Sequence, residues 1–160
     1  MEPCKEVSML RFIILVSAAI AVVSPSLAKP IDGHWIINRM ERAPWTEDNY
    51  VPDQSIASKY LQKKLTFSRT SIAGPVLLAC KRPNYKYDNV PADMMFQGGL
   101  AGIEGDTALA AKRATALGFT NQPIHTVTTD CEHDIAFHMK DDDHAAFALD
   151  NMIFWLTRTP

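Results

Sequence analysis

The chain has 160 residues, of which 47% are hydrophobic, and its 16 basic and 18 acidic residues leave a formal net charge of −2. A chain of this length suits one domain with one core. The near-neutral charge argues against the basic patch on which nucleic-acid and anionic-membrane binding depend, so neither partner is expected.

The first 28 residues carry the three-part pattern of a secretory signal peptide. Lys5 and Arg11 precede an apolar run over residues 12–23, and residues 26–28, Ser-Leu-Ala, supply small side chains before a cleavage site. The alternative is a retained membrane anchor, but so short a run does not span a bilayer. We therefore expect residues 1–28 to be removed and the protein to be periplasmic or secreted.

The mature chain, residues 29–160, keeps two cysteines, Cys80 and Cys131. In an oxidising compartment an even pair favours a disulfide, which would close a loop of about 50 residues and stabilise by roughly 4 kcal/mol. The alternative is two free thiols, one of which could act as a nucleophile. No CxxC motif and no Cys–His signature supports that alternative.

The first part of the mature chain predicts short strands separated by loops, because apolar alternation is repeatedly broken by Pro, Gly and polar clusters. In chain order we expect a strand at 32–40 and then a long irregular loop at 43–58, with room for one helical turn. Two strands follow at 60–69 and 72–80. After them we expect a basic and aromatic loop or short hairpin at 81–91 and a short strand at 94–97. The strand at 72–80 is interrupted near Gly74-Pro75.

One α-helix is expected after the glycine-rich connection at residues 98–106. Asp106 or Thr107 would cap this helix, which runs to Leu117 and stops at Gly118. The glycines resemble a phosphate-binding loop only superficially. Their spacing matches neither GxGxxG nor GxxxxGK[ST], and the acidic residues of the connection would repel an anion. A flexible connection is the better interpretation.

The C-terminal part of the chain predicts an antiparallel β-meander. A three-residue loop at residues 141–143 would set Phe137 opposite Phe147, and a two-residue turn at residues 150–151 would set Phe147 opposite Phe154. One face then carries the apolar side chains of a core wall, and a slip of one residue would turn them all to water. These side chains are Ile135, Phe137, Met139, Ala145, Phe147, Leu149, Met152, Phe154 and Leu156.

The opposite face of the closing hairpin carries Ala146, Ala148, Ile153 and Trp155. An exposed Ile and Trp would form an apolar patch that favours association. The small residues of the predicted helix permit close approach, so the helix is expected to pack outside the sheet over this face. The alternative is that Trp155 is an exposed anchor for another protein. With about eight strands and one helix, the chain predicts a mainly β fold, a single small antiparallel barrel or sandwich.

Gly33 and Trp35 on the first strand, with Arg158 near the end of the last, resemble the signature of lipocalin-like (calycin) barrels. In that family a G-x-W tryptophan packs under an arginine of the closing strand, because a guanidinium stacks on an indole and caps the closed end. The resemblance implies a barrel closed by the Trp35–Arg158 pair that binds a small ligand. Lipocalins place their helix near the end, whereas here it precedes the last four strands.

A second resemblance is to the META-domain proteins of bacterial envelopes. Their pattern of an early Trp, then L-x-F, then a Gly and a Cys, then a Tyr is echoed by Trp35, residues 65–67, Gly74, Cys80 and Tyr85. The chain lacks the Gly-Cys-Asn tripeptide of that family. Neither resemblance extends to further side chains that would form a site.

Histidines and acids gather between residues 130 and 144, among them His133, His138 and His144. Imidazole and carboxylate groups suit zinc or copper. No HxH or HExxH spacing is present, and Lys140 would share a face with His138 and oppose a cation. We therefore expect solvated turns, no metal and no cofactor.

Aromatic and cationic residues on two loops form the most informative surface. The predicted rim consists of Trp45, Tyr50, Lys81, Arg82, Tyr85, Lys86 and Tyr87. These residues suit an anionic or amphipathic ligand or a protein contact. The alternative is that the tyrosines edge the core and the lysines are solvated.

The predicted mature chain, residues 29–160, carries no GxSxG or SxxK motif, so a non-enzymatic binding protein for a small apolar or amphipathic ligand is the expected function. The alternatives are an envelope protein-interaction module of the inhibitor or immunity type and, less favoured, a secreted enzyme. A hollow barrel would favour the first function, and a packed interior with an exposed aromatic loop the second. A cleft with converging ionisable groups would favour the third.

Overall fold

The computed structural model describes residues 30–160, apart from the side chain of Gln54, so the predicted signal peptide lies outside the described residues. The strands are β1 (Gly33–Arg42), β2 (Lys64–Phe67), β3 (Ser71–Ala73), β4 (Cys80–Lys81), β5 (Tyr85–Val90), β6 (Ile124–Thr129), β7 (Phe137–Met139), β8 (His144–Leu149) and β9 (Met152–Thr159). The helices are α1 (Gln54–Tyr60), the 3₁₀ helix η1 (Ala92–Gly98) and α2 (Thr107–Ala116).

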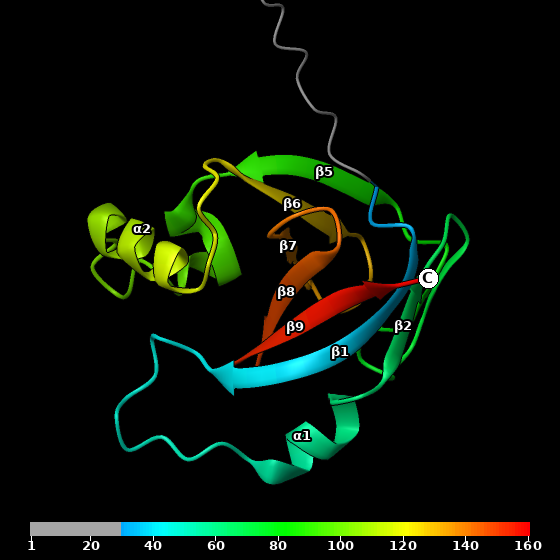
Figure 1. The fold of residues 1–160 in the computed structure, drawn as a ribbon, viewed down its shortest axis with the longest axis horizontal. Helices are drawn as coiled ribbons and strands as arrows, with labels where there is room; N and C mark the ends of the chain where they lie inside the picture. Colours follow the sequence, from blue (N-terminus) through cyan, green and yellow to red (C-terminus); the bar gives the residue numbers. More distant parts are fainter. Residues whose placement is uncertain (1–29) are drawn as a thin grey trace, which may run out of the picture.

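The strands form one nine-stranded antiparallel sheet in the order β4-β3-β2-β1-β9-β8-β7-β6-β5. The sheet curls into a half-barrel, with β5 at one edge and the β2–β4 region near the other (Figure 1). This architecture confirms the predicted mainly β fold with a helix outside the sheet.

The closing hairpin has the predicted register. Phe147 pairs with Phe154 across a turn at residues 150–151, where φ is 49° and 61°. Asp and Asn occupy those positions because they tolerate the left-handed backbone that a two-residue hairpin turn needs. Met139 lies opposite Ala145, so the β7–β8 pairing keeps the predicted phase as well.

The inner face of the curl is filled by side chains. Phe67 meets Phe137 edge-on with ring centroids 5.0 Å apart, and Phe147 stacks on Phe154 at 5.1 Å. The whole predicted core face of the meander belongs to this cluster. Because the aromatic rings interdigitate at ordinary packing distances, the interior is a packed core rather than a hollow cup.

A second cluster covers the outer face of β8 and β9. Ile153 and Trp155 pack there with Ala110 and Ala114 of α2, and Trp155 is only 5% exposed. Phe119, in the loop after α2, stacks on Trp155 with centroids 5.6 Å apart. The helix therefore lies outside the sheet on the predicted face, and Trp155 is not an exposed anchor.

The expected short strand at residues 94–97 is wrong, because this segment belongs to η1. Inside η1, Phe96 and Gln97 have φ values of 48° and 58°. The Phe96 N–H donates to Nε2 of His138 at 2.9 Å. This contact joins residues far apart in the chain, so local propensity carries no sign of it.

Two other segments are more regular than expected. The irregular loop at 43–58 ends in α1, whose first turn is capped by the carboxylate of Asp53 accepting from the Ser55 N–H at 2.8 Å. The loop or hairpin expected at 81–91 contains the full strand β5. The interruption expected at Gly74-Pro75 separates β3 from β4.

The predicted disulfide between Cys80 and Cys131 is present. Cys80 lies in β4, one edge strand of the sheet, and Cys131 follows β6, which neighbours the other edge strand, β5. Within the described residues no backbone ladder joins β4 to β5. The disulfide therefore ties together the two ends of the curled sheet where strand pairing does not.

Candidate functional site

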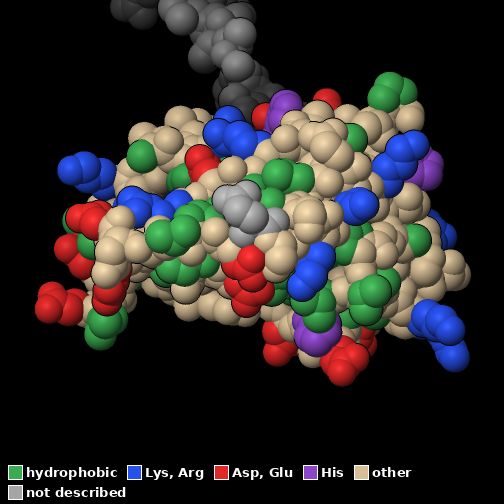
Figure 2. Space-filling model, turned by 90° about the horizontal axis from the view of Figure 1, so that it is seen from below, with side chains coloured by type: hydrophobic (Ala, Val, Ile, Leu, Met, Phe, Trp, Pro, Cys, Tyr) green, Lys and Arg blue, Asp and Glu red, His purple; other side chains and the backbone are tan. Residues whose placement is uncertain are grey.

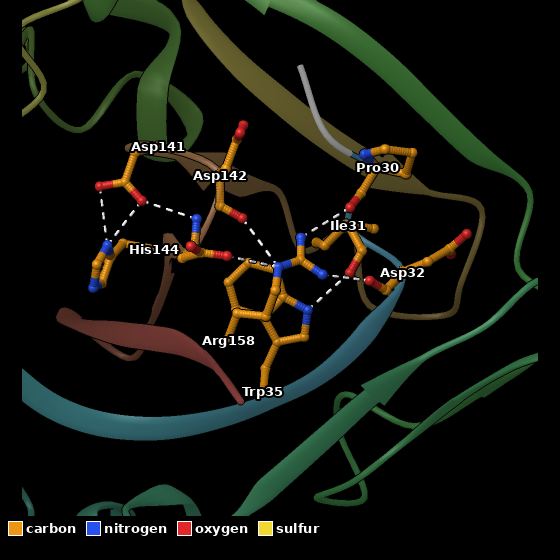
Figure 3. Close-up of polar contacts among 9 residues, drawn as sticks. Pro30, Ile31, Asp32, Trp35, Asp141, Asp142, His144 and Arg158 are labelled. Carbon is orange, nitrogen blue, oxygen red and sulfur yellow. Dashed lines mark hydrogen bonds and ion pairs between the residues drawn. The ribbon is translucent and has the colours of Figure 1, made fainter. Parts of the chain in front are cut away.

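One end of the half-barrel is closed by Arg158 (Figure 3). Trp35 of β1 and Arg158 of β9 are cross-strand partners, and the guanidinium carbon lies 4.2 Å from the centroid of the Trp35 ring. The indole N–H donates to the carbonyl of Ile31 at 2.8 Å. Burial of the ring beneath the cation strengthens the cation–π attraction, so this pair acts as a cap.

The same guanidinium binds two chain segments. Its Nη atoms donate to the carbonyls of Pro30 and Asp32, and its Nε donates to the carbonyl of Asp142 at 3.0 Å. Nε also lies 3.2 Å from a carboxylate oxygen of Asp143. Arg158 thus holds the N-terminal segment and the β7–β8 turn against the end of the sheet.

Steric crowding explains why the first position of the G-x-W pattern is a glycine. Gly33 has a φ of 122°, and a Cβ there would lie 3.0 Å from Nη1 of Arg158. A side chain would therefore be strained by its backbone and crowded by the guanidinium. The closed end is a structural cap rather than a ligand site.

Two adjacent clefts lie at the opposite end of β9, beside the β8–β9 turn. The lysine cleft has a volume of about 540 Å³ and is lined by Ile56, Lys59, Tyr60, Lys63, Lys64, Gly74, Pro75, Val76, Leu77 and Asp150. The aromatic cleft has a volume of about 510 Å³ and is lined by Trp45, Leu77, Phe96, Gln97, His133, Asp134, Ile135, Ala136, Ala148, Leu149, Asp150 and Asn151. Leu77 and Asp150 belong to both clefts.

The lysine cleft combines positive charge with an apolar wall. Lys59 lies in the last turn of α1, Lys63 just before β2 and Lys64 at the start of β2. None of the three forms an ion pair within residues 30–160. Val76 is 91% exposed and Leu77 36% exposed on the facing β3–β4 turn. The arrangement can attract an anionic group and contact an apolar chain beside it.

The walls of the lysine cleft are held by close backbone approach. A Cβ at Gly74 would lie 2.5 Å from a methyl carbon of Leu65, so a side chain there would have to displace Leu65, and glycine lets the β3–β4 turn lie this close to β2. Tyr60 packs inward against Phe154, with centroids 5.3 Å apart. Burial, with a smaller effect from the negative charge of Asp150, raises the pKa of the Tyr60 hydroxyl. Tyr60 is therefore a neutral part of the floor.

The aromatic cleft is built around Trp45. Its indole N–H donates to Oδ1 of Asn151 at 3.3 Å, and its ring lies 5.7 Å from that of Phe96. A Cβ at Gly99 would lie 2.8 Å from the Trp45 ring, so the indole packs directly on the backbone there. Gln97 donates to the carbonyl of Asp134 at 3.1 Å and fixes the rim.

His138 lies beneath η1 and is not a solvated turn residue, in contrast to the expectation for this cluster. It is 1% exposed, and burial lowers the pKa of its imidazole to about 4. Nε2 accepts from the Phe96 N–H, so Nδ1 carries the proton and donates to Thr126 Oγ1 at 2.9 Å. The neutral ring is therefore a structural hydrogen-bond bridge.

The other two histidines of the cluster, His133 and His144, are exposed and lie apart from His138. His144 contacts the Asp141 carboxylate at 2.8 Å, and His133 lines the aromatic cleft. Within residues 30–160, no group of three or more His, Cys, Asp or Glu side chains lies close enough together to hold a metal ion. The absence of a metal in the functional protein stays a prediction.

The structure divides the predicted rim into two groups. Trp45 and Tyr50 meet at the β8–β9 turn, where the Tyr50 hydroxyl donates to the carbonyl of Asp150 at 2.9 Å. The other five, which line neither named cleft, are Lys81, Arg82, Tyr85, Lys86 and Tyr87 on β4, β5 and their connection.

Tyr85 has a structural role within the fold and is not an exposed contact residue of the predicted rim. Its hydroxyl donates to the carbonyl of Ser68 at 2.9 Å. Burial is the main cause that raises its pKa, to about 12, so it stays a neutral donor. Tyr87 is 44% exposed and stacks on His125 with centroids 5.8 Å apart.

Sequence reasoning missed the residues of the lysine cleft. The sequence predicts Lys63 and Lys64 within one strand and Val76 and Leu77 within the next. A signal was present: apolar residues just after Gly74-Pro75 belong to a turn and are candidates for exposure. The sequence alone could not show that α1 and this turn face each other in the folded protein.

Comparison with protein-family models, with curated proteins and with solved structures finds no match to this chain. None of the helices in residues 30–160 has the length and apolar character required to cross a membrane.

Proposed function

We propose that this protein is a non-enzymatic binding protein that takes a small amphipathic ligand with an anionic head group in the lysine cleft. The observation that carries the proposal is the set of three lysines, Lys59, Lys63 and Lys64, which form no ion pair with the described residues and lie beside an exposed apolar wall. A carboxylate, sulfate or phosphate head would contact the ammonium groups. An apolar chain would lie along Val76 and Leu77.

The packed interior supports binding at the mouth instead of deep inside the curl. A cleft of about 540 Å³ is within the usual range for small-molecule sites, but it is open on one side. The ligand would therefore keep part of its surface in water, and its affinity would depend on both head and tail. The Arg158–Trp35 cap supports a likeness to lipocalin-like barrels, which remains part of this proposal.

The disulfide indicates an oxidising compartment. A periplasmic or secreted location fits both this compartment and the signal-peptide pattern of residues 1–28. Such a location belongs to the proposal.

A protein-interaction module is the second candidate, because Val51 and Val76 are 82% and 91% exposed. Figure 2 views the molecule from the side on which α1 lies in Figure 1. Apolar side chains surface there in small areas between basic and acidic groups. Protein interfaces usually need a larger continuous apolar centre, so the small-molecule proposal is favoured.

Calorimetric titration with two amphiphiles of nearly equal tail length, dodecanoate and dodecyltrimethylammonium, tests the proposal below their micelle concentrations. Dodecanoate is expected to bind at one site and the cationic amphiphile to bind much more weakly. Equal binding of both head groups would reject the lysine cleft as an anion site. Absence of dodecanoate binding would reject the function.

A matched pair of variants locates the site. Lys63→Glu is expected to weaken dodecanoate binding by about fivefold, since one exposed attraction becomes a repulsion. Lys112→Glu makes the same charge change on the exposed side of α2 and is expected to change affinity by less than about twofold. Equal losses in both variants would show a nonspecific effect of net charge.

A further inference from the structure

The strand β5 is a free edge of the sheet. Its six residues pair with β6 on one side only, and within residues 30–160 no backbone hydrogen bond joins its other side to the chain. The opposite edge strand, β4, has only two residues and is tied down by the disulfide. Figure 1 shows β5 along the outer margin of the curl, with no other helix or strand of residues 30–160 beyond it.

Exposed edge strands usually carry a device that prevents pairing, most often a lysine. Lys86 is such a residue, and it is exposed. Asp88, also exposed, follows two positions later on the same face of β5. A lone lysine would block an approaching strand, but a lysine and an aspartate at this spacing become complementary when the approaching strand is an antiparallel copy of itself.

The two-fold register is determined by this spacing. In a self-pairing of antiparallel strands that is centred on Tyr87, Lys86 lies opposite the partner's Asp88, and Asp88 lies opposite the partner's Lys86. Two opposite-charge pairs form, one on each side of the axis. The same register sets the partly exposed Tyr87 opposite the partner's Tyr87. This register is symmetric about Tyr87, so hydrogen-bonded and non-hydrogen-bonded pairs alternate in the same way on both sides of the axis. The backbone ladder can therefore form without a bulge.

We propose that two copies of this chain associate through their β5 edges, antiparallel and about a two-fold axis at Tyr87, to form one continuous sheet. The occupant of each edge is therefore a second copy, because the edge complements its own charge sequence. The interface is isologous and closes at two copies. It does not use the residues of the lysine cleft, so the dimer and the ligand site can succeed or fail separately.

Sedimentation velocity over a concentration series, with the disulfide intact, tests the dimer. Wild-type protein is expected to show a reversible monomer–dimer equilibrium. Lys86→Asp and Asp88→Lys, each alone, are expected to weaken dimerisation by about tenfold or more, because two attractions become two repulsions. Lys112→Asp on α2 is the control for net charge and is expected to dimerise like wild type.

The decisive measurement mixes the two single variants. Lys86→Asp and Asp88→Lys chains together place opposite charges at both cross-strand positions, so a heterodimer of wild-type strength is expected. Thermal melts confirm that both variants are folded. A wild-type chain that stays monomeric at every concentration would overturn the proposal, as would single variants that dimerise normally or a mixture that does not recover.

Amide hydrogen exchange gives an independent reading. Alternate amides of β5 are expected to exchange more slowly at high than at low protein concentration, since the outward N–H groups become paired. Concentration-dependent protection confined to another segment would place the interface elsewhere and overturn the proposal.

Discussion

Arg158 joins more separate parts of the chain than any other residue described at the closed end. Its side chain is 11% exposed, lies over Trp35 and donates to three backbone carbonyls. These contacts are charge-assisted, which makes each stronger than a neutral hydrogen bond. Arg158 therefore anchors the N-terminal segment and the β7–β8 turn, neither of which has regular secondary structure of its own.

Arg158→Ala is expected to lower the free energy of unfolding by about 2–4 kcal/mol, because three backbone carbonyls lose a charge-assisted donor and the indole loses its cation. Arg39 is a matched control: its guanidinium carbon lies 4.5 Å from the Trp155 ring centroid, but its side chain is 55% exposed. Arg39→Ala is expected to cost less than about 1 kcal/mol. Urea unfolding measures both, and equal losses would contradict the role assigned to the backbone contacts.

His138 makes the stability of the protein depend on pH in mildly acidic solution. Its folded pKa of about 4 lies below the ordinary value of 6.5, so the folded state binds fewer protons than the unfolded state. The contribution to stability is fully present above pH 6.5 and is lost as the pH falls toward 4. The loss amounts to roughly 3 kcal/mol at most.

A comparison of wild type with His138→Gln isolates this effect. The variant is expected to be less stable at pH 7 but to lose less stability between pH 6.5 and 4, since the titrating group is gone. Melting temperatures at closely spaced pH values give the two slopes. Parallel slopes in that window would show that carboxylates, and not His138, dominate the acid response.

At the scale of elements, α2 and the sheet approach closely because the helix presents small side chains. Ala110 and Ala114 are 0% exposed against the cluster that contains Trp155. The helix has a suitable N-cap, because Asp106 accepts from the Leu109 N–H at 2.9 Å. Its position is nevertheless set by the fit between two thin apolar faces.

Ala114→Leu is expected to destabilise the protein by about 1–3 kcal/mol, since a larger side chain would push α2 away from the sheet. Ala111→Leu adds the same side chain on the exposed side of the helix and is expected to change stability by less than about 0.5 kcal/mol. Stronger quenching of tryptophan fluorescence by iodide in Ala114→Leu alone would support the loss of cover over Trp155. Equal effects in the two variants would contradict this packing.

At the scale of the whole molecule, the half-barrel is closed by covalent chemistry. The disulfide spans 51 positions and connects the two edges of a sheet that lacks a closing ladder within residues 30–160. A cross-link over a long loop restricts the unfolded chain strongly. The covalent closure also leaves the β5 edge free for the association proposed above.

Replacement of both Cys80 and Cys131 by serine is expected to lower the free energy of unfolding by about 4 kcal/mol and the melting temperature by roughly 10 °C or more. Wild type treated with reductant should match the variant. Titration of denatured, non-reduced protein should find neither of these thiols free. Two reactive thiols from these positions, or an unchanged melting temperature after reduction, would contradict the closing role.

Several features of this protein were readable from the sequence by itself. Alternation of apolar residues with an Asp-Asn turn determined the β8–β9 register, because a slip of one residue would expose the whole core face. The Asp106 cap and Gly118 bounded α2 within one residue, since helix ends have local chemical requirements. The disulfide followed from the count of two cysteines after the predicted signal peptide.

Other features were decided only by the tertiary structure. The left-handed Phe96 in η1 depends on a hydrogen bond to His138, which lies 42 positions away. The lysine cleft depends on α1 facing the β3–β4 turn, and the free edge at β5 depends on where the curl ends. Local sequence carries periodicity, caps and turns, but these sites arise from contacts between segments distant in the chain, and no local pattern encodes which segments meet.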